Sequence, residues 1–290
     1  MTKDLPIIVI TGPTASGKTK VATTLARKID AEIISADSRA VYKGFDIVSA
    51  KPTKEEMNGI IHHLIDILEP DNDFSAGDFV TLASQKIEEI KAKNKRIIIV
   101  GGTWFYIKSL LDKKMLPPIP ANPELRKELE TFESKELWQR LYKIDKKRAE
   151  EINENNKEKI IRSIEMCDYL KSPISQYERQ DNKNFNSIWY CPLIEKELLY
   201  ENINKRVDIM MQQGLFKEFE KMTNLWGIDN KIINNTIGYQ EFIEYEDINC
   251  AVDKIKQHTR NFAKRQLTYF KNNEGIKKLP LVELLSLRDI

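Results

Sequence analysis

The sequence has 290 residues, of which 41% are hydrophobic and 31% charged, a composition typical of a soluble protein with a full hydrophobic core. The 46 basic and 44 acidic residues nearly cancel to a net charge of +2, so a nucleic-acid-binding surface would require local clustering of cations. No apolar run approaches the ~20 residues that span a membrane, and there is no room for a signal peptide before the first predicted strand, so we expect a cytoplasmic protein.

The first predicted element is a buried strand at Ile7–Ile10, followed by a glycine-rich loop and an amphipathic helix. This order is typical of a P-loop, in which backbone N–H groups and the helix N-terminus bind a phosphate group. Lys18 would add a positive charge, and Thr19 would offer its hydroxyl to a magnesium ion. We therefore predict a di- or triphosphate site at the loop GPTASGKT, which comprises Gly12, Pro13, Thr14, Ala15, Ser16, Gly17, Lys18 and Thr19.

A second strand, Glu32–Ser35, is predicted to end just before Asp37. In open α/β sheets, ligands bind beside the carboxyl ends of the strands, so Asp37 is expected next to the P-loop. A carboxylate in that position can accept a proton or hold a metal ion. The alternative is that Asp37 is an N-cap or turn aspartate.

The segment His62–Asp66 is predicted to be a strand, and Ser75–Lys93 a helix with its N-terminal cap. Because neighbouring residues on a strand point to opposite faces, His62 and His63 cannot bind one metal ion together. We expect at least one of the two histidines to be structural.

The clearest strand, Arg96–Val100, ends in Gly101-Gly102-Thr103 and leads into a helix that reaches Leu111. P-loop ATPases often have an acidic residue after such a strand, and its absence argues against a hydrolytic motor. The glycines favour a transferase whose second substrate approaches this edge of the sheet closely. A tight strand-to-helix turn is the alternative explanation, and both can hold together.

Three prolines within residues 117–120 predict a domain boundary. Residues 122–184 follow with helical periodicity and many charged side chains, which predicts a small helical insertion. We expect the cations of its main helix to form a solvated surface, which is the usual arrangement, and not a nucleic-acid contact. These cations are Lys157, Lys159, Arg162 and Lys171.

After the insertion, a strand at Ser187–Leu193 returns the chain to the sheet, and the next helix contains Arg206 and ends at Gly214. The last long helix spans about Ala251–Lys271. Its predicted buried side comprises Ile255, Phe262, Ala263, Leu267 and Phe270. Its cations form a basic stripe, which can bind nucleic-acid phosphates but is as often a solvated face. The basic stripe comprises Lys256, Arg260, Lys264, Arg265 and Lys271.

Several motifs, taken in order, resemble the tRNA dimethylallyltransferases, also called tRNA isopentenyltransferases. The blocks are GPTASGKT (12–19), SADSRAVY (35–42), AKP (50–52), HHLID (62–66), VGGT (100–103), IGY (237–239) and TR..AKRQ (259–266). A P-loop alone is shared by many unrelated proteins, whereas this ordered set is specific and spans nearly the whole chain.

The resemblance implies an α/β fold with a P-loop NTPase-like three-layer core, a mostly parallel sheet and a small all-helical insertion domain. The first part of the core would span residues 1–120. The insertion, residues 121–185, would grip the tRNA anticodon stem-loop. Residues 186–290 would complete the core and carry a basic tRNA-binding helix.

The resemblance also implies transfer of a dimethylallyl group from dimethylallyl diphosphate to N6 of the adenine just 3′ of the anticodon, flipped out of its stack. Lys18 would bind the diphosphate, Thr19 its Mg²⁺ ion, and Arg206 the diphosphate from the other side. Asp37 would accept the proton of the adenine amine, and Thr103 would lie near the tRNA and the reacting centre.

Residues at matching positions are expected to contact tRNA. They are Asp37, Ser38, Arg39, Ala40, Thr103, Arg126, Glu158, Lys159, Ile160, Ile161, Arg162, Asn235, Thr236, Ile237, Gly238, Tyr239, Gln240, Lys264, Arg265, Gln266, Leu267, Thr268, Tyr269, Phe270 and Lys271. The sequence departs from the family pattern at Ala40, Trp104-Phe105, Asn235 and Gln240, which leaves the chemistry intact and affects only tRNA affinity.

Three other functions remain as alternatives: a small-molecule kinase, a prenyltransferase that modifies free AMP or ATP, and a non-catalytic, nucleotide-gated RNA-binding module. A kinase has no use for the block at 35–51 or for a basic C-terminal helix. A free-nucleotide enzyme needs neither the insertion nor the basic stripe, and a binding module needs no proton acceptor at Asp37. We expect a monomer without an obligate protein partner.

Overall fold

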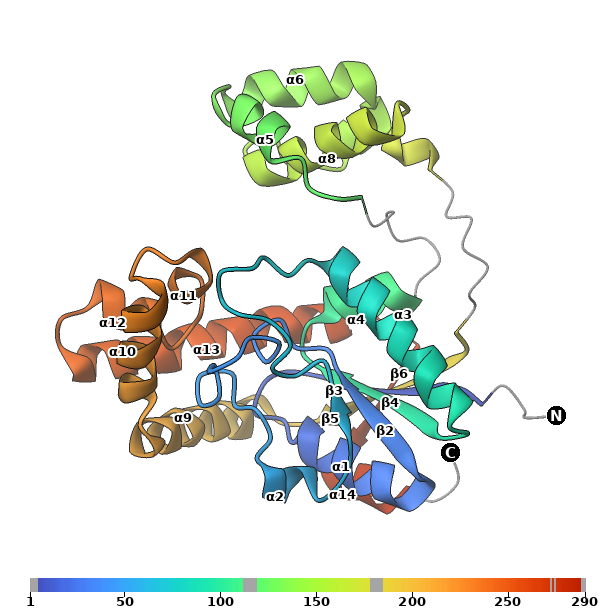
Figure 1. Ribbon diagram of the computed structural model, residues 1–290, viewed down its shortest axis with the longest axis vertical. Helices are drawn as coiled ribbons and strands as arrows, with labels where there is room; N and C mark the ends of the chain where they lie inside the picture. The colour runs from blue at the N-terminus through green and yellow to red at the C-terminus, as the bar shows by residue number, and fades with distance from the viewer. Residues whose placement is uncertain (1–4, 112–118, 178–184, 272, 274, 288–290) are drawn as a thin grey trace. The chain divides into compact units, whose positions relative to one another are not determined.

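The computed structural model describes residues 5–111, 119–177, 185–271, 273 and 275–287 (Figure 1). Two of the boundary prolines, Pro117 and Pro118, lie outside these residues. Contacts divide the chain into two units. The first comprises Met1–Ser75, Phe79–Leu111 and Phe185–Ile290, and the second comprises Ala76–Asp78 and Asp112–Asn184.

A six-stranded sheet in the order β3-β2-β4-β1-β5-β6 forms the centre of the first unit. Its strands are β1 (Ile7–Thr11), β2 (Ala31–Ser35), β3 (His62–His63), β4 (Arg96–Gly101), β5 (Ser187–Leu193) and β6 (Ile276–Pro280). Strand β1 pairs with β4 and β5, and all of its residues are buried, as a continuous apolar run between two helical layers requires. The predicted α/β class is confirmed, and every pairing between these strands is parallel.

The strand predicted at His62–Asp66 is shorter than expected and is limited to two residues. Leu64 and Asp66 have φ angles of 61° and 55°, a left-handed conformation that ends extended backbone. The two histidines have different surroundings: His63 Nε2 lies 2.7 Å from Oε2 of the buried Glu32, whereas His62 lines the cavity described below. His63 therefore has the structural role expected of at least one histidine.

Helices cover both faces of the sheet and produce the predicted three layers (Figure 1). The helices outside residues 112–184 are α1 (Lys18–Ile29), α2 (Lys54–Met57), α3 (Ala76–Ala92), α4 (Trp104–Leu111), α9 (Lys196–Gln213), α10 (Leu215–Trp226), α11 (Lys231–Asn234), α12 (Gln240–Glu244), α13 (Ile248–Lys271) and α14 (Leu281–Ser286). Helices α1 and α14 lie on one face, and α3 and α4 lie on the other. None of the described helices has the length and apolar content to cross a bilayer.

The second unit is helical over its described part after residue 118. Its elements are α5 (Pro123–Glu130), α6 (Ser134–Ile144), α7 (Lys146–Glu150), α8 (Lys157–Leu170) and a short 3-10 helix, Ile174–Gln176. Apolar side chains from all four α-helices form its core, with Leu129, Leu141 and Ile160 fully buried. The helical character predicted for the insertion is thus observed.

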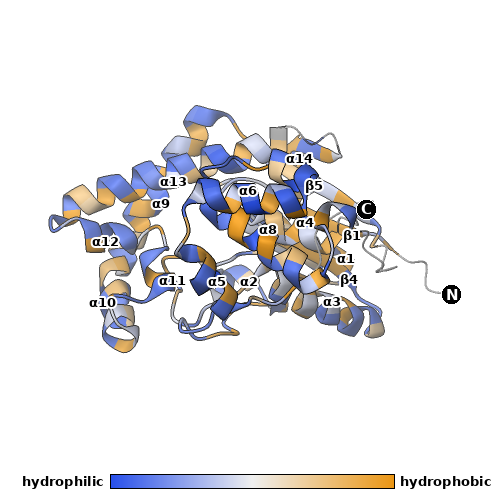
Figure 2. Cartoon of the chain, turned by 90° about the horizontal axis from the view of Figure 1, so that it is seen from above, coloured by the Kyte–Doolittle hydropathy of each residue, from blue (hydrophilic) through white to orange (hydrophobic). Residues whose placement is uncertain are grey.

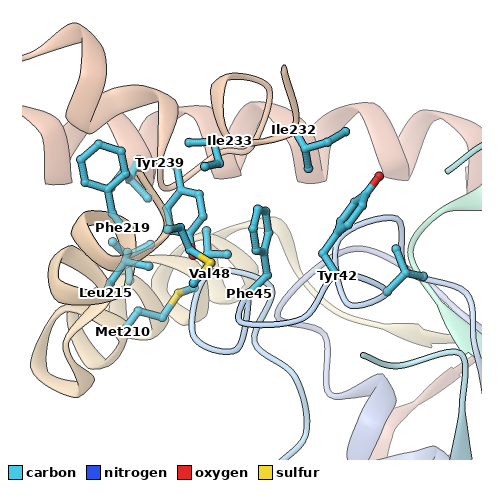
Figure 3. Close-up of a cluster of buried hydrophobic side chains, with 13 residues drawn as sticks. Tyr42, Phe45, Val48, Met210, Leu215, Phe219, Ile232, Ile233 and Tyr239 are labelled. Atoms are coloured by element: carbon cyan, nitrogen blue, oxygen red, sulfur yellow. The ribbon is translucent and has the colours of Figure 1, made fainter. Parts of the chain in front are cut away.

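A hydrophobic core in the first unit, apart from the sheet, joins the segment after β2 to helices α9–α13 (Figure 3). Phe45 lies at its centre, with its ring centroid 5.1 Å from that of Tyr239 and 5.6 Å from that of Tyr42. This core holds the chain segments that form the walls of the cavity described below.

Helix α13 is amphipathic, with hydrophilic and hydrophobic residues alternating along its length (Figure 2). Of its predicted buried side, Ile255, Ala263 and Phe270 are buried and Leu267 is partly buried. The prediction is wrong for Phe262, whose side chain is 37% exposed and lines the cavity.

Gly101 at the end of β4 and Gly102 just after it are required by the packing of the protein itself. A Cβ atom added to Gly101 would lie 2.1 Å from the carbonyl oxygen of Ala36, and one added to Gly102 would lie 2.3 Å from Nε2 of Gln266. Strand β4 ends at Gly101 and α4 begins at Trp104, so the tight strand-to-helix turn, the alternative explanation for these glycines, is also present. No approaching substrate is needed to explain them.

We expect Gly101→Ala to lower the free energy of unfolding by about 2 kcal/mol or more, because the clash with the Ala36 backbone is relieved only by moving a strand end. Urea denaturation measures this change. Gly275→Ala is the control, since the nearest atom that its added Cβ would meet among the described residues is Asn273 Oδ1, at 3.4 Å. Equal midpoints for the two variants would contradict the packing argument.

Candidate active site

The P-loop has the local geometry that its sequence predicts. Gly17 has a φ of 84° and occupies the N-cap of α1, and Gly12 has a φ of 142°. Both values favour glycine, so the loop can curl at both ends without strain. The Lys18 ammonium donates a hydrogen bond of 2.5 Å to the carbonyl of Pro13 and so stays folded back over the loop.

A cavity of about 280 Å³ opens beside the P-loop. Its lining includes all four residues predicted to be catalytic, Lys18, Asp37, Thr103 and Arg206, together with the predicted metal ligand Thr19. These residues come from α1, the segments after β2 and β4, and α9, so the fold brings together positions nearly 190 residues apart along the chain.

One part of the cavity wall is apolar. Its side chains come from the loop before α2, from α9 and from α13, and include Val48, Ile203, Val207, Met210, Ile255 and Phe262. The cavity therefore offers a charged end at the P-loop and a separate surface for a hydrocarbon group. Such a combination suits a ligand with a phosphate head and an apolar tail.

Two cations share the charged end. Arg206 Nη1 donates a hydrogen bond of 3.3 Å to Thr14 Oγ1. Burial and the nearby Arg206 guanidinium lower the pKa of Lys18 from 10.5 to about 8, although Asp37 acts in the opposite direction. Burial also lowers the pKa of Arg206. Two half-buried cations, both close enough to Asp37 to feel its charge, form an environment that favours a bound anion.

Because Lys18 loses its charge as the pH rises through about 8, we expect binding of inorganic pyrophosphate to weaken in that range. Between pH 7 and pH 9 the charged fraction falls about tenfold, and the dissociation constant should rise by about the same factor. Isothermal titration calorimetry measures this constant. Lys18→Met is the control for the ionisation of pyrophosphate itself. An identical pH dependence of the dissociation constant in that variant would contradict the prediction.

Asp37 shapes a turn and also faces the cavity, while its predicted role as a proton acceptor stays a prediction. Its Oδ1 accepts hydrogen bonds from the backbone N–H groups of Arg39 (2.8 Å) and Ala40 (3.1 Å), so it does shape a turn. Its side chain also lines the cavity, and none of the described residues donates a hydrogen bond to its Oδ2. One oxygen thus fixes the carboxylate and the other is available to a ligand. Thr103 Oγ1 supports the same turn by accepting a hydrogen bond of 3.2 Å from the N–H of Ser38.

Gln266 holds the P-loop in place, a role that the sequence did not reveal. Its Oε1 accepts a hydrogen bond of 2.8 Å from the N–H of Thr14, and its Nε2 donates one of 2.9 Å to the carbonyl of Gly102. The side chain is 6% exposed. Gln266 was predicted to contact tRNA; in the structure both ends of its side-chain amide are bonded within the protein.

Comparison with known proteins identifies the relatives of this chain. Residues 40–273 match the model of the IPP transferase family. The tRNA dimethylallyltransferase of Acetivibrio thermocellus is 43% identical over 282 residues, which cover 93% of this chain and 90% of the relative. The chain belongs to the IPP transferase family. The resemblance inferred from the motifs is thus confirmed, and the P-loop lies before the range that matches the family model.

Solved structures of IPP transferases agree with this fold. The tRNA isopentenylpyrophosphate transferase of Bacillus halodurans is similar with a TM-score of 0.70 and 37% identity, covering 95% of this chain and 89% of that one. A eukaryotic dimethylallyltransferase acting on tRNA has a TM-score of 0.83 at 24% identity, covering 96% of this chain and 74% of that one, and supports the fold alone.

The structure narrows the set of residues predicted to contact tRNA in this IPP transferase. Seven of the predicted side chains are buried and form no exposed surface: Ala40, Ile160, Ile161, Thr236, Tyr239, Gln266 and Phe270. Packing in the hydrophobic cores explains the burial of the isoleucines and of the aromatic residues. Exposed positions include Glu158, Lys159, Asn235, Lys264, Arg265, Thr268 and Tyr269, whereas the side chain of Lys271 lies outside the described residues.

The basic stripe on α13 divides into two parts. Lys256 forms an ion pair of 2.6 Å with Asp208, and Arg260 donates a hydrogen bond of 2.6 Å to Asn204, so both cations hold α13 against α9. Lys264 and Arg265 are exposed. The surface available to a polyanion is therefore the C-terminal half of the stripe.

In the second unit, Glu165 holds two residues predicted to contact tRNA, Arg126 and Arg162, and was not among the predicted site residues. Its buried carboxylate accepts hydrogen bonds from Arg126 Nε (2.9 Å) and Nη2 (2.8 Å), and it also pairs with Arg162. Hydrogen bonds from Arg126, Asn122 and Arg162 hold the pKa of Glu165 below its usual value against the effect of burial. An acidic residue three positions after Arg162 on one helix face was the available clue.

Proposed function

We propose that this protein transfers a dimethylallyl group from dimethylallyl diphosphate to N6 of the tRNA adenine just 3′ of the anticodon. The observation that carries the proposal is one cavity that is lined by Asp37, by two half-buried cations, Lys18 and Arg206, and by an apolar wall. The apolar wall fits a hydrocarbon tail, and a triphosphate-dependent kinase would have no use for such a wall.

The reaction forms a bond from the adenine N6 to C1 of the prenyl group and breaks the bond between C1 and the diphosphate oxygen. Lys18, Arg206 and the P-loop N–H groups stabilise the negative charge that develops on the leaving diphosphate. Asp37 accepts the proton that N6 loses, with its Oδ1 fixed by the turn and its Oδ2 directed to the base. The apolar wall keeps water away from the reacting carbon.

A magnesium ion fits the residues present. Mg²⁺ usually takes most of its ligands from water and substrate phosphates and only one or two from the protein. Thr19 and Asp37 line the same cavity, and the described residues contain no cluster of three His, Cys, Asp or Glu side chains that would hold a metal without a substrate. When bound together with the diphosphate, the magnesium ion would screen the charge of the diphosphate, and Thr19 would hold the ion.

The exposed cations of α13 and of the second unit are proposed to bind the anticodon stem-loop. We expect Lys264→Ala to weaken tRNA binding and to reduce the slope of log K against log salt concentration by about 0.7–0.9, because one phosphate contact is lost. Lys256→Ala is the matched control, since its side chain pairs with Asp208 and contacts no phosphate. Fluorescence anisotropy over a salt series measures both slopes, and equal slopes would contradict the proposed surface.

The deciding experiment incubates the protein with labelled dimethylallyl diphosphate and, in separate reactions, with an unmodified tRNA or with AMP; a parallel reaction supplies ATP. We expect label on the tRNA and none on a tRNA in which the adenine after the anticodon is replaced by guanine. Label on AMP instead of tRNA would establish the free-nucleotide enzyme. Phosphate transfer from ATP would establish a kinase, and tRNA binding without transfer would leave only the binding module.

A further inference from the structure

Glu218 on α10 binds the loop that precedes the AKP motif. Its Oε2 accepts hydrogen bonds from the N–H groups of Asp46 (3.0 Å) and Ile47 (2.7 Å). Its Oε1 accepts hydrogen bonds from the N–H of Val48 (2.9 Å) and from the hydroxyl of Tyr239 (2.8 Å). One half-buried carboxylate therefore satisfies four donors from two separate chain segments.

Those two segments are walls of the cavity. Val48 and the four residues after it line one side, and residues 235–238, just before Tyr239, line another. The walls also touch directly: a Cβ atom added to Gly238, which has a φ of 103°, would lie 2.8 Å from Val48 Cγ2. In Figure 3, Val48 and Phe45 lie beside Tyr239 within one hydrophobic core.

The four hydrogen bonds require a carboxylate. Three consecutive backbone N–H groups of a loop converge on it, and a carboxylate alone among the side chains of this size offers two acceptor oxygens. Burial and the Glu218 carboxylate raise the pKa of Tyr239, so its hydroxyl stays protonated and remains a donor. Glutamine at this position would turn an N–H₂ group toward two of the four donors.

We propose that Glu218 is a positioning residue that fixes the apolar wall around the prenyl group of the substrate. The proposal rests on the proposed function, because it assigns the tail of the same ligand to Val48 and its neighbours. Glu218 has no hydrogen bond to the P-loop, to Lys18 or to Arg206. Its loss should therefore affect recognition of the prenyl tail and leave recognition of the diphosphate unchanged.

The test compares Glu218→Gln with Glu220→Gln, an exposed position on the same helix. We expect Glu218→Gln to raise the KM for dimethylallyl diphosphate about tenfold or more. The inhibition constant of inorganic pyrophosphate, which lacks the tail, should stay within twofold of the wild-type value. Glu220→Gln should change neither constant. Hydrogen–deuterium exchange should become faster at Asp46, Ile47 and Val48 in Glu218→Gln alone.

Two results would overturn the proposal: an unchanged KM in Glu218→Gln, or an equal weakening of pyrophosphate and dimethylallyl diphosphate, which would indicate a general loss of structure. If Glu218→Gln does not fold, the test uses Tyr239→Phe, which removes one of the four donors and keeps the ring. The KM for dimethylallyl diphosphate must then rise while the inhibition constant of pyrophosphate stays unchanged. Absence of prenyl transfer by the wild-type protein would instead refute the proposed function.

Discussion

Replacing Asp37 by asparagine is expected to lower the rate of prenyl transfer by about 10²–10⁴-fold, the usual contribution of a positioned general base. Asparagine keeps a side-chain oxygen that can accept the hydrogen bonds from Arg39 and Ala40, so the turn survives while the proton acceptor is lost. Single-turnover kinetics with labelled dimethylallyl diphosphate measure the rate. The affinity for tRNA and the thermal midpoint should stay close to those of the wild type.

Asp37→Ala removes the turn as well as the base, and comparison of the two variants separates these roles. We expect the alanine variant to be as slow as the asparagine variant or slower, and also less stable by about 1 kcal/mol, the usual value of a lost cap. An asparagine variant whose rate lies within tenfold of the wild type would refute the assignment of Asp37 as the base.

The second large effect is expected at Lys18. Lys18→Met keeps the length of the side chain but removes the charge next to the leaving diphosphate, and should lower kcat by about 10²–10³-fold. The loss should appear in kcat because negative charge on the leaving group grows as the bond to carbon breaks. Lys20→Met on the exposed side of α1 is the control. A change in KM alone would show that Lys18 only binds the ground state.

Local patterns predicted the main strands and the place of Asp37 beside the P-loop, and the family resemblance implied the three-layer architecture. The apolar runs of β1 and β4 and the periodicity of α1 follow from burial, and the glycines of the P-loop from backbone conformation. Since the carboxyl ends of parallel strands meet at one edge, Asp37 could be placed beside Lys18 from the strand pattern alone. Strand β3 was overpredicted because the left-handed conformation of Leu64 and Asp66 has no strong signature in those residue types.

The residues that hold the site together could not be predicted in this way. Gln266 bonds to Thr14 across 252 positions, and Glu218 bonds to Val48 across 170 positions. A glutamine or glutamate on a helix is ordinary by composition, and only the folded chain shows which backbone groups lie opposite it. The partners of Lys256 and Arg260 were missed for the same reason, because Asp208 and Asn204 lie on another helix.

The hydrogen bond between Thr14 and Gln266 has a consequence for the order in which parts of the chain fold during synthesis. Residues 12–19 leave the ribosome early, but the amide that fixes their loop arrives only with residue 266. Strand β5, which pairs with β1, also follows the whole second unit. A growing chain can therefore fold its helical insertion before its phosphate site is complete, and a chain that stops short of α13 has no finished P-loop.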